Sequence, residues 1–95
     1  MFKELDPLLH SELRLGVMSI LIGVDSADFT YIRKETGATA GNLSVQLEKL
    51  SQAGYITIEK GYNGKMPCTT CRITKQGIKA FGEYVEALQT YISKR

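Results

Sequence analysis

The 95-residue sequence contains no tryptophan, one histidine, two cysteines and two prolines. A single histidine, His10, leaves few ways to build a hydrolytic or metal site, and two cysteines do not make a disulfide scaffold. No apolar run approaches the roughly 20 residues of a membrane span, and the N-terminus lacks the long apolar segment of a signal peptide. We therefore expect a cytoplasmic protein that is not an enzyme, with no catalytic residue, cofactor, metal site or membrane partner.

The length and the charge pattern set further bounds. The chain has 95 residues, of which 43% are hydrophobic, and it can therefore bury one modest core. We expect one domain over residues 1–95, of a size at which a partner subunit often adds stability. The net charge of +2 is unevenly spread: residues 1–30 carry two basic and five acidic side chains, whereas residues 60–82 carry five basic and no acidic ones. The basic segment is either an ordinary solvated surface or a site for nucleic acid.

Three helices are predicted in the first half of the chain. Asp6 followed by Pro7 is typical of a helix start, and apolar residues at helical spacing follow as far as Gly23. Each of the next two helices has a capping side chain before it and a glycine after it. The predicted segments are Asp6 to Gly23, Ser26 or Asp28 to Thr36 with Gly37 as the stop, and a third helix from Thr39 to Gly54.

A hairpin and a last helix follow. After Gly54 the apolar period becomes two, Asn63-Gly64 is a strong turn signal, and 68–74 is the returning strand. Residues 75–93 form the last helix, and the sequence leaves open whether residues 24–28 add a third strand. The predicted fold is mainly α with a small β-hairpin wing (α+β), a winged helix-turn-helix with a C-terminal dimerisation helix.

The third helix, residues 39–52, is the one available to enter a DNA major groove. Its leucines face inward, which leaves small polar residues on the outer side of its first half. Asn42 and Gln46 could pair bidentately with adenine, and Val45 could touch a thymine methyl, whereas Glu48 is unfavourable near phosphates. The candidate DNA contacts on this helix are Thr39, Gly41, Asn42, Ser44, Val45, Gln46 and Lys49.

The hairpin carries part of the basic segment. Lys60 and Lys65 flank its tip and Arg72 lies on its returning strand, so the wing, residues 60–72, could reach phosphates or the minor groove. We predict sequence-specific binding of double-stranded DNA by the helix and the wing together. A winged helix that binds another protein is the alternative.

A family resemblance is carried by Gly41-Asn42-Leu43-Ser44, then Ala53-Gly54-Tyr55-Ile56, Gly64-Lys65, and Ile73-Thr74 with Gly77, Ala80 and Phe81. This order resembles the small winged-helix transcriptional regulators related to the MarR and ArsR groups, over most of the chain. The resemblance implies a homodimer that binds roughly palindromic operator DNA, with 39–52 as recognition helix and the hairpin around Gly64 as wing. In similar proteins the position of Cys68 is often basic, which puts one wing contact in doubt.

The last helix independently predicts a dimer. Apolar residues spaced three, four, three and four apart form a stripe typical of a coiled coil: Ile78, Phe81, Val85, Leu88 and Ile92. An apolar N-terminal patch that includes Leu5 and Leu9 could cover this stripe from the other subunit. The alternative is a stripe that packs only on its own first helix.

Cys68 and Cys71 suggest redox or metal chemistry. Cys68 and Cys71 are three positions apart, which on a strand separates them by roughly 10 Å and points their side chains to opposite faces. This distance is too large for a disulfide. Zinc also requires four ligands, and the chain has two thiols and one distant histidine. A thiol- or metal-responsive regulator therefore remains a minor alternative. The sequence leaves open the operator, repression or activation, and any small-molecule effector.

Overall fold

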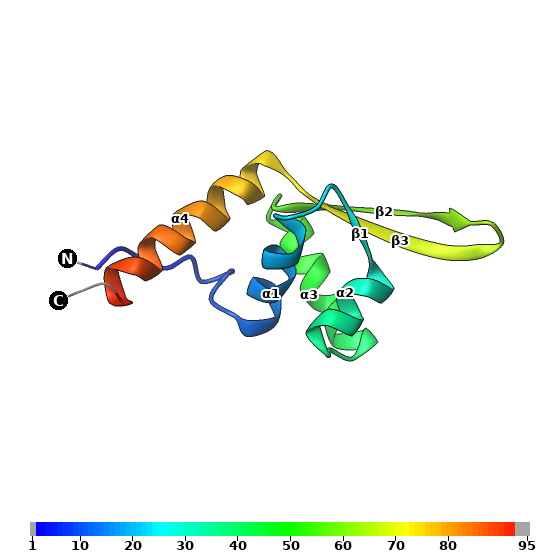
Figure 1. The fold of residues 1–95 in the computed structure, drawn as a ribbon, viewed down its shortest axis with the longest axis horizontal. Coiled ribbons are helices and arrows are strands. Elements are labelled where there is room, and N and C mark those ends of the chain that lie inside the picture. The colour runs from blue at the N-terminus through cyan, green and yellow to red at the C-terminus, as the bar shows by residue number, and fades with distance from the viewer. Residues whose placement is uncertain (1, 93–95) are drawn as a thin grey trace.

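The computed structural model describes residues 2–92. Its elements follow the order helix, strand, helix, helix, hairpin, helix (Figure 1). The molecule is elongated, 55 × 25 × 21 Å, because the hairpin and the last helix project from opposite ends of a compact centre. The elements are α1 (Glu12–Leu21), β1 (Ala27–Asp28), α2 (Phe29–Thr36), α3 (Ala40–Gln52), β2 (Ile56–Asn63), β3 (Met66–Ile73) and α4 (Lys75–Ile92).

The limits of α2 and α3 confirm the sequence signals. Asp28 Oδ1 accepts a hydrogen bond from the Tyr31 backbone N–H at 2.7 Å, which caps α2. Thr39 Oγ1 accepts one from the Asn42 N–H at 3.2 Å, which caps α3. Gly37 ends α2 with φ of 71°, in the left-handed region that favours glycine.

The predicted start of the first helix at Asp6 is wrong. α1 begins at Glu12, with Ser11 in the N-cap position, and residues 7–9 form a turn. Asp6 caps only this turn, since its Oδ1 accepts from the Leu8 N–H at 3.0 Å. Its Oδ2 accepts from the Tyr55 hydroxyl at 2.5 Å, so Asp6 joins the N-terminal segment to the residues that follow α3.

The sheet has three antiparallel strands in the order β1-β3-β2. β1 is two residues long and pairs Ala27 with Cys71 and Asp28 with Thr70, so residues 24–28 do supply a third strand. Beyond Asp28 the hairpin has only its own two strands, and it extends away from the centre as the wing (Figure 1). The observed returning strand begins at Met66, two residues before the predicted start.

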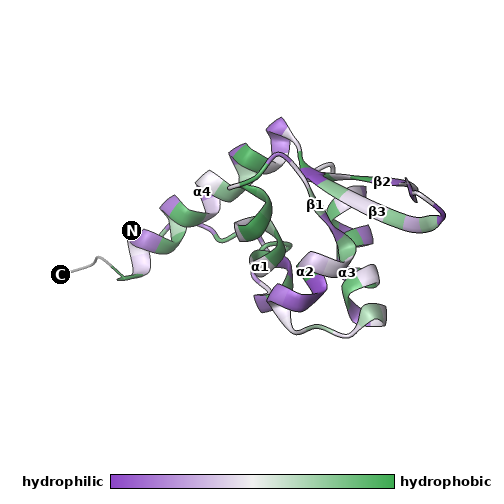
Figure 2. Ribbon diagram, turned by 45° about the vertical axis from the view of Figure 1, so that its right-hand side comes forward, coloured by the Kyte–Doolittle hydropathy of each residue, from purple (hydrophilic) through white to green (hydrophobic). Residues whose placement is uncertain are grey.

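The core lies between α1, α2, α3 and the base of the sheet. Figure 2 shows α1 mostly in the green of hydrophobic residues and α2 mostly in purple, which fits the inner place of α1. α1 contacts α2, α3 and β3. The large, fully buried side chains are Leu9, Val17, Met18, Leu21, Ile32, Leu43, Leu50, Ile56 and Cys71.

α4 is fixed at its start by the chain around Gly54. Thr74 Oγ1 donates to the Gly54 carbonyl at 2.6 Å and accepts from the Gly77 N–H at 2.9 Å. Gly77 is buried so close to the Tyr55 carbonyl that a Cβ atom there would lie 2.1 Å from its oxygen. Ser93, the predicted last residue of this helix, lies outside the described residues.

The N-terminal segment, residues 2–10, runs back along the far end of α4 (Figure 1). The Lys3 N–H donates to Thr90 Oγ1 at 3.2 Å, and the Tyr91 hydroxyl donates to the Lys3 carbonyl at 3.2 Å. Phe2 stacks on Tyr91, with ring centroids 4.6 Å apart. The segment therefore closes the fold by joining the two ends of the described chain.

Candidate nucleic-acid interface

The first half of α3 presents the polar surface that the sequence predicts. Leu43, Leu47 and Leu50 anchor the helix from behind. Of the predicted contacts on this helix and at its cap, Gln46 is partly buried. The other six are exposed: Thr39, Gly41, Asn42, Ser44, Val45 and Lys49. A Cβ atom at Gly41 would meet nothing within 4 Å, so this turn of the helix leaves room for another molecule.

A chain of side-chain hydrogen bonds crosses from α1 to α3. Arg14 Nη1 donates to Gln46 Oε1, and Gln46 Nε2 donates to Asn42 Oδ1 at 3.1 Å. Gln46, predicted as a free contact, thus has both ends of its amide engaged within the protein. Arg14 was missed by sequence reasoning because it lies 32 residues before Gln46 and no local pattern links them.

The predicted DNA contacts of the wing do not all lie on the same face of the hairpin. Side chains alternate between the two faces of a strand pair, so Lys60 shares a face with Ile58 and Thr69, whereas Arg72 lies opposite Thr57 on the other face. Lys65 lies in the turn after Gly64, whose φ is 68°. Lys60 and Arg72 therefore lie on opposite faces of the wing, and Lys65 lies at its tip.

α3 and the wing line one groove of about 370 Å³. Ser44 and Glu48 contribute from α3, and Lys60 and Thr69 contribute from the wing. The groove brings a predicted helix contact and a predicted wing contact to the same surface. The carboxylate of Glu48 lies within it, one turn beyond Ser44.

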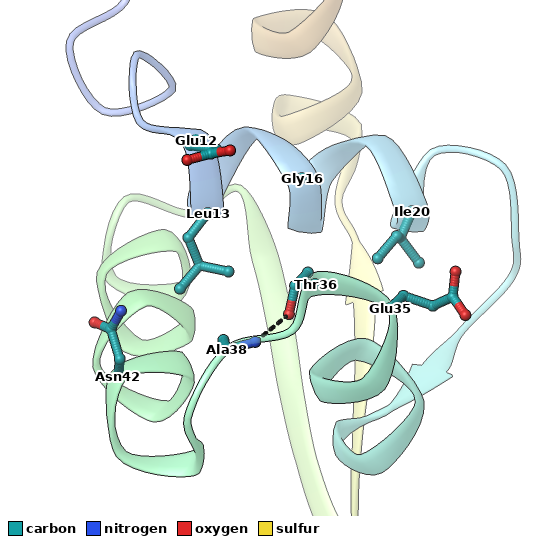
Figure 3. Close-up of a pocket in the computed structure, with 8 residues that line it drawn as sticks. All are labelled: Glu12, Leu13, Gly16, Ile20, Glu35, Thr36, Ala38 and Asn42. Carbon is teal, nitrogen blue, oxygen red and sulfur yellow. Dashed lines mark hydrogen bonds between the residues drawn. The ribbon is translucent and has the colours of Figure 1, made fainter.

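A second hollow, of about 460 Å³, lies between α1, the end of α2 and the start of α3 (Figure 3). Glu12 and Glu35 stand at its two sides, and both are exposed. The Ala38 N–H donates to Thr36 Oγ1 at 3.4 Å across its floor. Asn42, a predicted helix contact, also lines this hollow (Figure 3). Two exposed carboxylates repel phosphate, so the electrostatics favour the phosphate backbone on the wing side of α3, and Asn42 lies on the acidic side.

Comparison with known proteins identifies the architecture. A family model described as winged helix DNA-binding domain matches residues 13–92. The chain belongs to this winged helix DNA-binding domain family. The winged helix-turn-helix predicted from the sequence is thus confirmed, as is its likeness to transcriptional regulators, MarR-family members among them.

Three relatives of this winged-helix chain extend the comparison. A transcriptional regulator homologue from Pyrococcus horikoshii OT3 is 28% identical, with a TM-score of 0.84 over 90% of this chain and 85% of that one. A PadR family transcriptional regulator from Eggerthella lenta is 27% identical, with a TM-score of 0.64 over 86% and 80%. The uncharacterized protein MJ0432 of Methanocaldococcus jannaschii is 30% identical over 86% of this chain and 90% of its own.

The predicted dimer residues of this winged-helix protein divide into two groups. α4 turns Gly77, Tyr84 and Ala87 into the core, and Leu5, Phe81 and Leu88 pack against that core while partly exposed. Leu9 is completely buried within the protomer, so its predicted place on a dimer surface is wrong. Three residues of the stripe remain exposed: Ile78 (48%), Val85 (38%) and Ile92 (64%).

Neither cysteine of the winged-helix domain forms a disulfide. Cys68 is partly exposed, and Cys71 is fully buried where β3 meets β1. Burial raises the pKa of the Cys71 thiol to about 11, so very little of it is the reactive thiolate near neutral pH. Within residues 2–92, no cluster of three or more His, Cys, Asp or Glu side chains could hold a metal ion, and no helix meets the length and hydropathy of a membrane span.

The two thiols should react at very different rates. We expect a maleimide reagent at pH 7 to label one cysteine per native chain, Cys68, and both after denaturation, because about one in ten thousand Cys71 thiols is ionised at that pH. Mass spectrometry of peptides from labelled protein measures this, and a Cys68→Ala variant should take up no label when native. Equal labelling of both cysteines in the native protein would contradict the burial of Cys71.

Proposed function

We propose that the protein is a homodimeric transcriptional regulator that binds a roughly palindromic DNA operator with sequence specificity. On this proposal it acts in the cytoplasm through binding and not through catalysis. α3 enters the major groove, and the wing, residues 60–72, lies on the backbone or in the minor groove. The observation that carries the proposal is the groove shared by α3 and the wing, in which Ser44 and Lys60 lie on one surface.

The distribution of charge supports this orientation. Lys60 lines the groove on the wing side of α3 and Lys65 lies at the tip of the wing, whereas Glu12 and Glu35 flank the hollow on the other side of α3. Each lysine that neutralises a phosphate releases a counterion, which makes binding depend on salt. Arg72, on the outer face of the wing, donates to the Asp25 carbonyl at 3.5 Å and lies outside this contact surface.

The dimer is proposed on the exposed part of the α4 stripe. Ile78, Val85 and Ile92 lie about one, three and five turns along the helix on one side, beside the buried face. A second copy related by a two-fold axis would cover the same three residues on each subunit. Two recognition helices related in this way require an operator with matching two-fold symmetry.

Titration of labelled DNA tests the proposal. We expect the protein to bind duplex DNA from the upstream region of its own gene more tightly than unrelated DNA, with an affinity that falls as salt is raised. Affinity should be measured at several salt concentrations with unrelated duplex as competitor. Absence of salt-dependent binding to any duplex would exclude the proposal.

Two single variants separate the roles of helix and wing. Asn42→Ala should remove about 1–3 kcal/mol of discrimination at one base position in each half-site. Lys65→Ala should weaken binding to all duplexes alike and reduce the salt slope by about 1, because a phosphate contact carries no sequence information. Competition between operator and altered duplexes measures both, and identical behaviour of the two variants would contradict the division of roles.

A further inference from the structure

We propose that Arg14, which belongs to α1 and not to the recognition helix, determines which base Asn42 reads. Acting through Gln46, it holds the Asn42 amide with its NH₂ group free and its oxygen engaged, so that Asn42 favours guanine over adenine. Arg14 is thus a positioning residue for base recognition. This inference rests on the proposed DNA-binding function.

The orientation of both amides follows from the chemistry of the guanidinium group. A guanidinium has only donors, so the end of the Gln46 amide that faces Arg14 must be its oxygen. The other end, Nε2, then faces Asn42 and donates at 3.1 Å, which requires that Asn42 present its oxygen. Nδ2 of Asn42 is left with both hydrogens unused within residues 2–92, and the residue is exposed.

Arg14 is itself held in place. Its Nε donates to the Leu8 carbonyl at 2.5 Å, and the Leu8 N–H donates to Asp6 Oδ1 at 3.0 Å. The N-terminal turn therefore fixes the guanidinium on the side of α3. Because Arg14 is partly buried between this turn and Gln46, the orientation of the amides is set before any DNA arrives.

The base preference follows from the groups that face the major groove. Bidentate pairing with adenine needs the asparagine oxygen to accept from N6 while its nitrogen donates to N7. Gln46 already donates to one of the two lone pairs of the Asn42 oxygen, which weakens the first of these bonds. Guanine offers two acceptors, O6 and N7, and no donor at that edge, so it suits a free NH₂ group better.

Gln46→Glu provides a test because it reverses the direction of the hydrogen bond between residues 46 and 42 while the side chain keeps its size and shape. One oxygen of the new carboxylate accepts from Arg14, and the other can only accept, so the Asn42 amide must turn over and donate to it. Asn42 then presents its oxygen outward, which suits the amino group of adenine or cytosine. Gln52→Glu is the control for charge, because it adds the same charge at the exposed end of α3 and leaves Arg14, Gln46 and Asn42 unchanged. It also removes the donation from Gln52 Nε2 to Glu48 Oε2 at 3.5 Å, so it is compared by base preference and not by affinity.

The measurement is selection of bound duplexes from a random pool, for wild type and both variants, after circular dichroism has shown that each is folded. We expect wild type to prefer guanine over adenine on the order of tenfold at one position per half-site, and Gln46→Glu to reverse this preference. Gln52→Glu should weaken binding but keep the guanine. An unchanged preference in Gln46→Glu overturns the role of Arg14 while DNA binding stands, whereas failure of wild type to select any sequence overturns the proposed function itself.

Discussion

Gly77→Ala is expected to destabilise the protein by about 3 kcal/mol or more, or to prevent folding. The added Cβ would lie 2.1 Å from the Tyr55 carbonyl oxygen and 2.9 Å from Ile73 Cγ1. That carbonyl already accepts the Thr74 N–H at 3.0 Å, so it cannot move away without loss of the hydrogen bond. Urea unfolding at one fixed protein concentration measures the effect.

Gly82→Ala is the matched control for this substitution. Gly82 lies on the same helix, one turn from Ile78 and from Val85, and within one subunit a Cβ atom there would meet nothing within 4 Å. Alanine should therefore stabilise the helix by about 0.5–1 kcal/mol, because glycine loses more conformational entropy on folding. The two alanine variants should thus change the free energy of unfolding with opposite sign. Equal effects would show that α4 does not start against Tyr55 in the way described.

Val85→Asp is expected to convert the proposed dimer to a monomer. A carboxylate placed in an apolar interface is buried without a partner, which costs free energy. In a two-fold interface each subunit contributes one such carboxylate, so the cost is incurred twice. We expect the dimer dissociation constant to rise by about 100-fold or more, with a comparable loss of affinity for a two-half-site operator. Light scattering at micromolar concentration measures the first effect, and DNA titration measures the second.

Val24→Asp is the control for the loss of the dimer. Val24 is similarly exposed, at 44%, but lies in the loop between α1 and β1. The same chemical change there should leave the mass of the particle and the operator affinity nearly unchanged. Persistence of a dimer in Val85→Asp would remove the α4 stripe from the proposed interface.

Local signals made much of the fold predictable. The limits of α2 and α3 depend on Asp28, Thr39 and Gly37, each of which acts on backbone groups within four residues. The hairpin depends in the same way on the turn at Gly64. Side chains that act on their own neighbourhood leave a signature in the sequence, and these elements were found from it.

Non-local contacts explain what was missed. Asp6 has the local pattern of a helix cap, but one of its oxygens accepts from the hydroxyl of Tyr55, 49 residues away. β1 consists of two residues, too short for any periodicity, and is defined only by its pairing with β3. Arg14 lies 32 residues from Gln46. None of these pairs can be inferred from spacing.

The apolar pattern of the sequence also did not predict which face of α4 packs against the core. Ile78, Val85 and Ile92 form an apolar row, and the row that includes Tyr84 and Ala87 lies beside it on the same helix. Both rows have coiled-coil spacing. The row that contains Gly77 faces the core, because a residue without a side chain lets the start of the helix approach the Tyr55 carbonyl.

The N-terminal segment gives the molecule an order of assembly. The Lys3 N–H donates to Thr90 Oγ1, 87 residues further along the chain, so this contact joins two segments that are far apart in the sequence. The hairpin and the helices around it can form from neighbouring parts of the chain before it forms, whereas a contact of such high sequence separation must form late. The contact between the N-terminal segment and the far end of α4 is thus expected to form after α3 and the hairpin have folded.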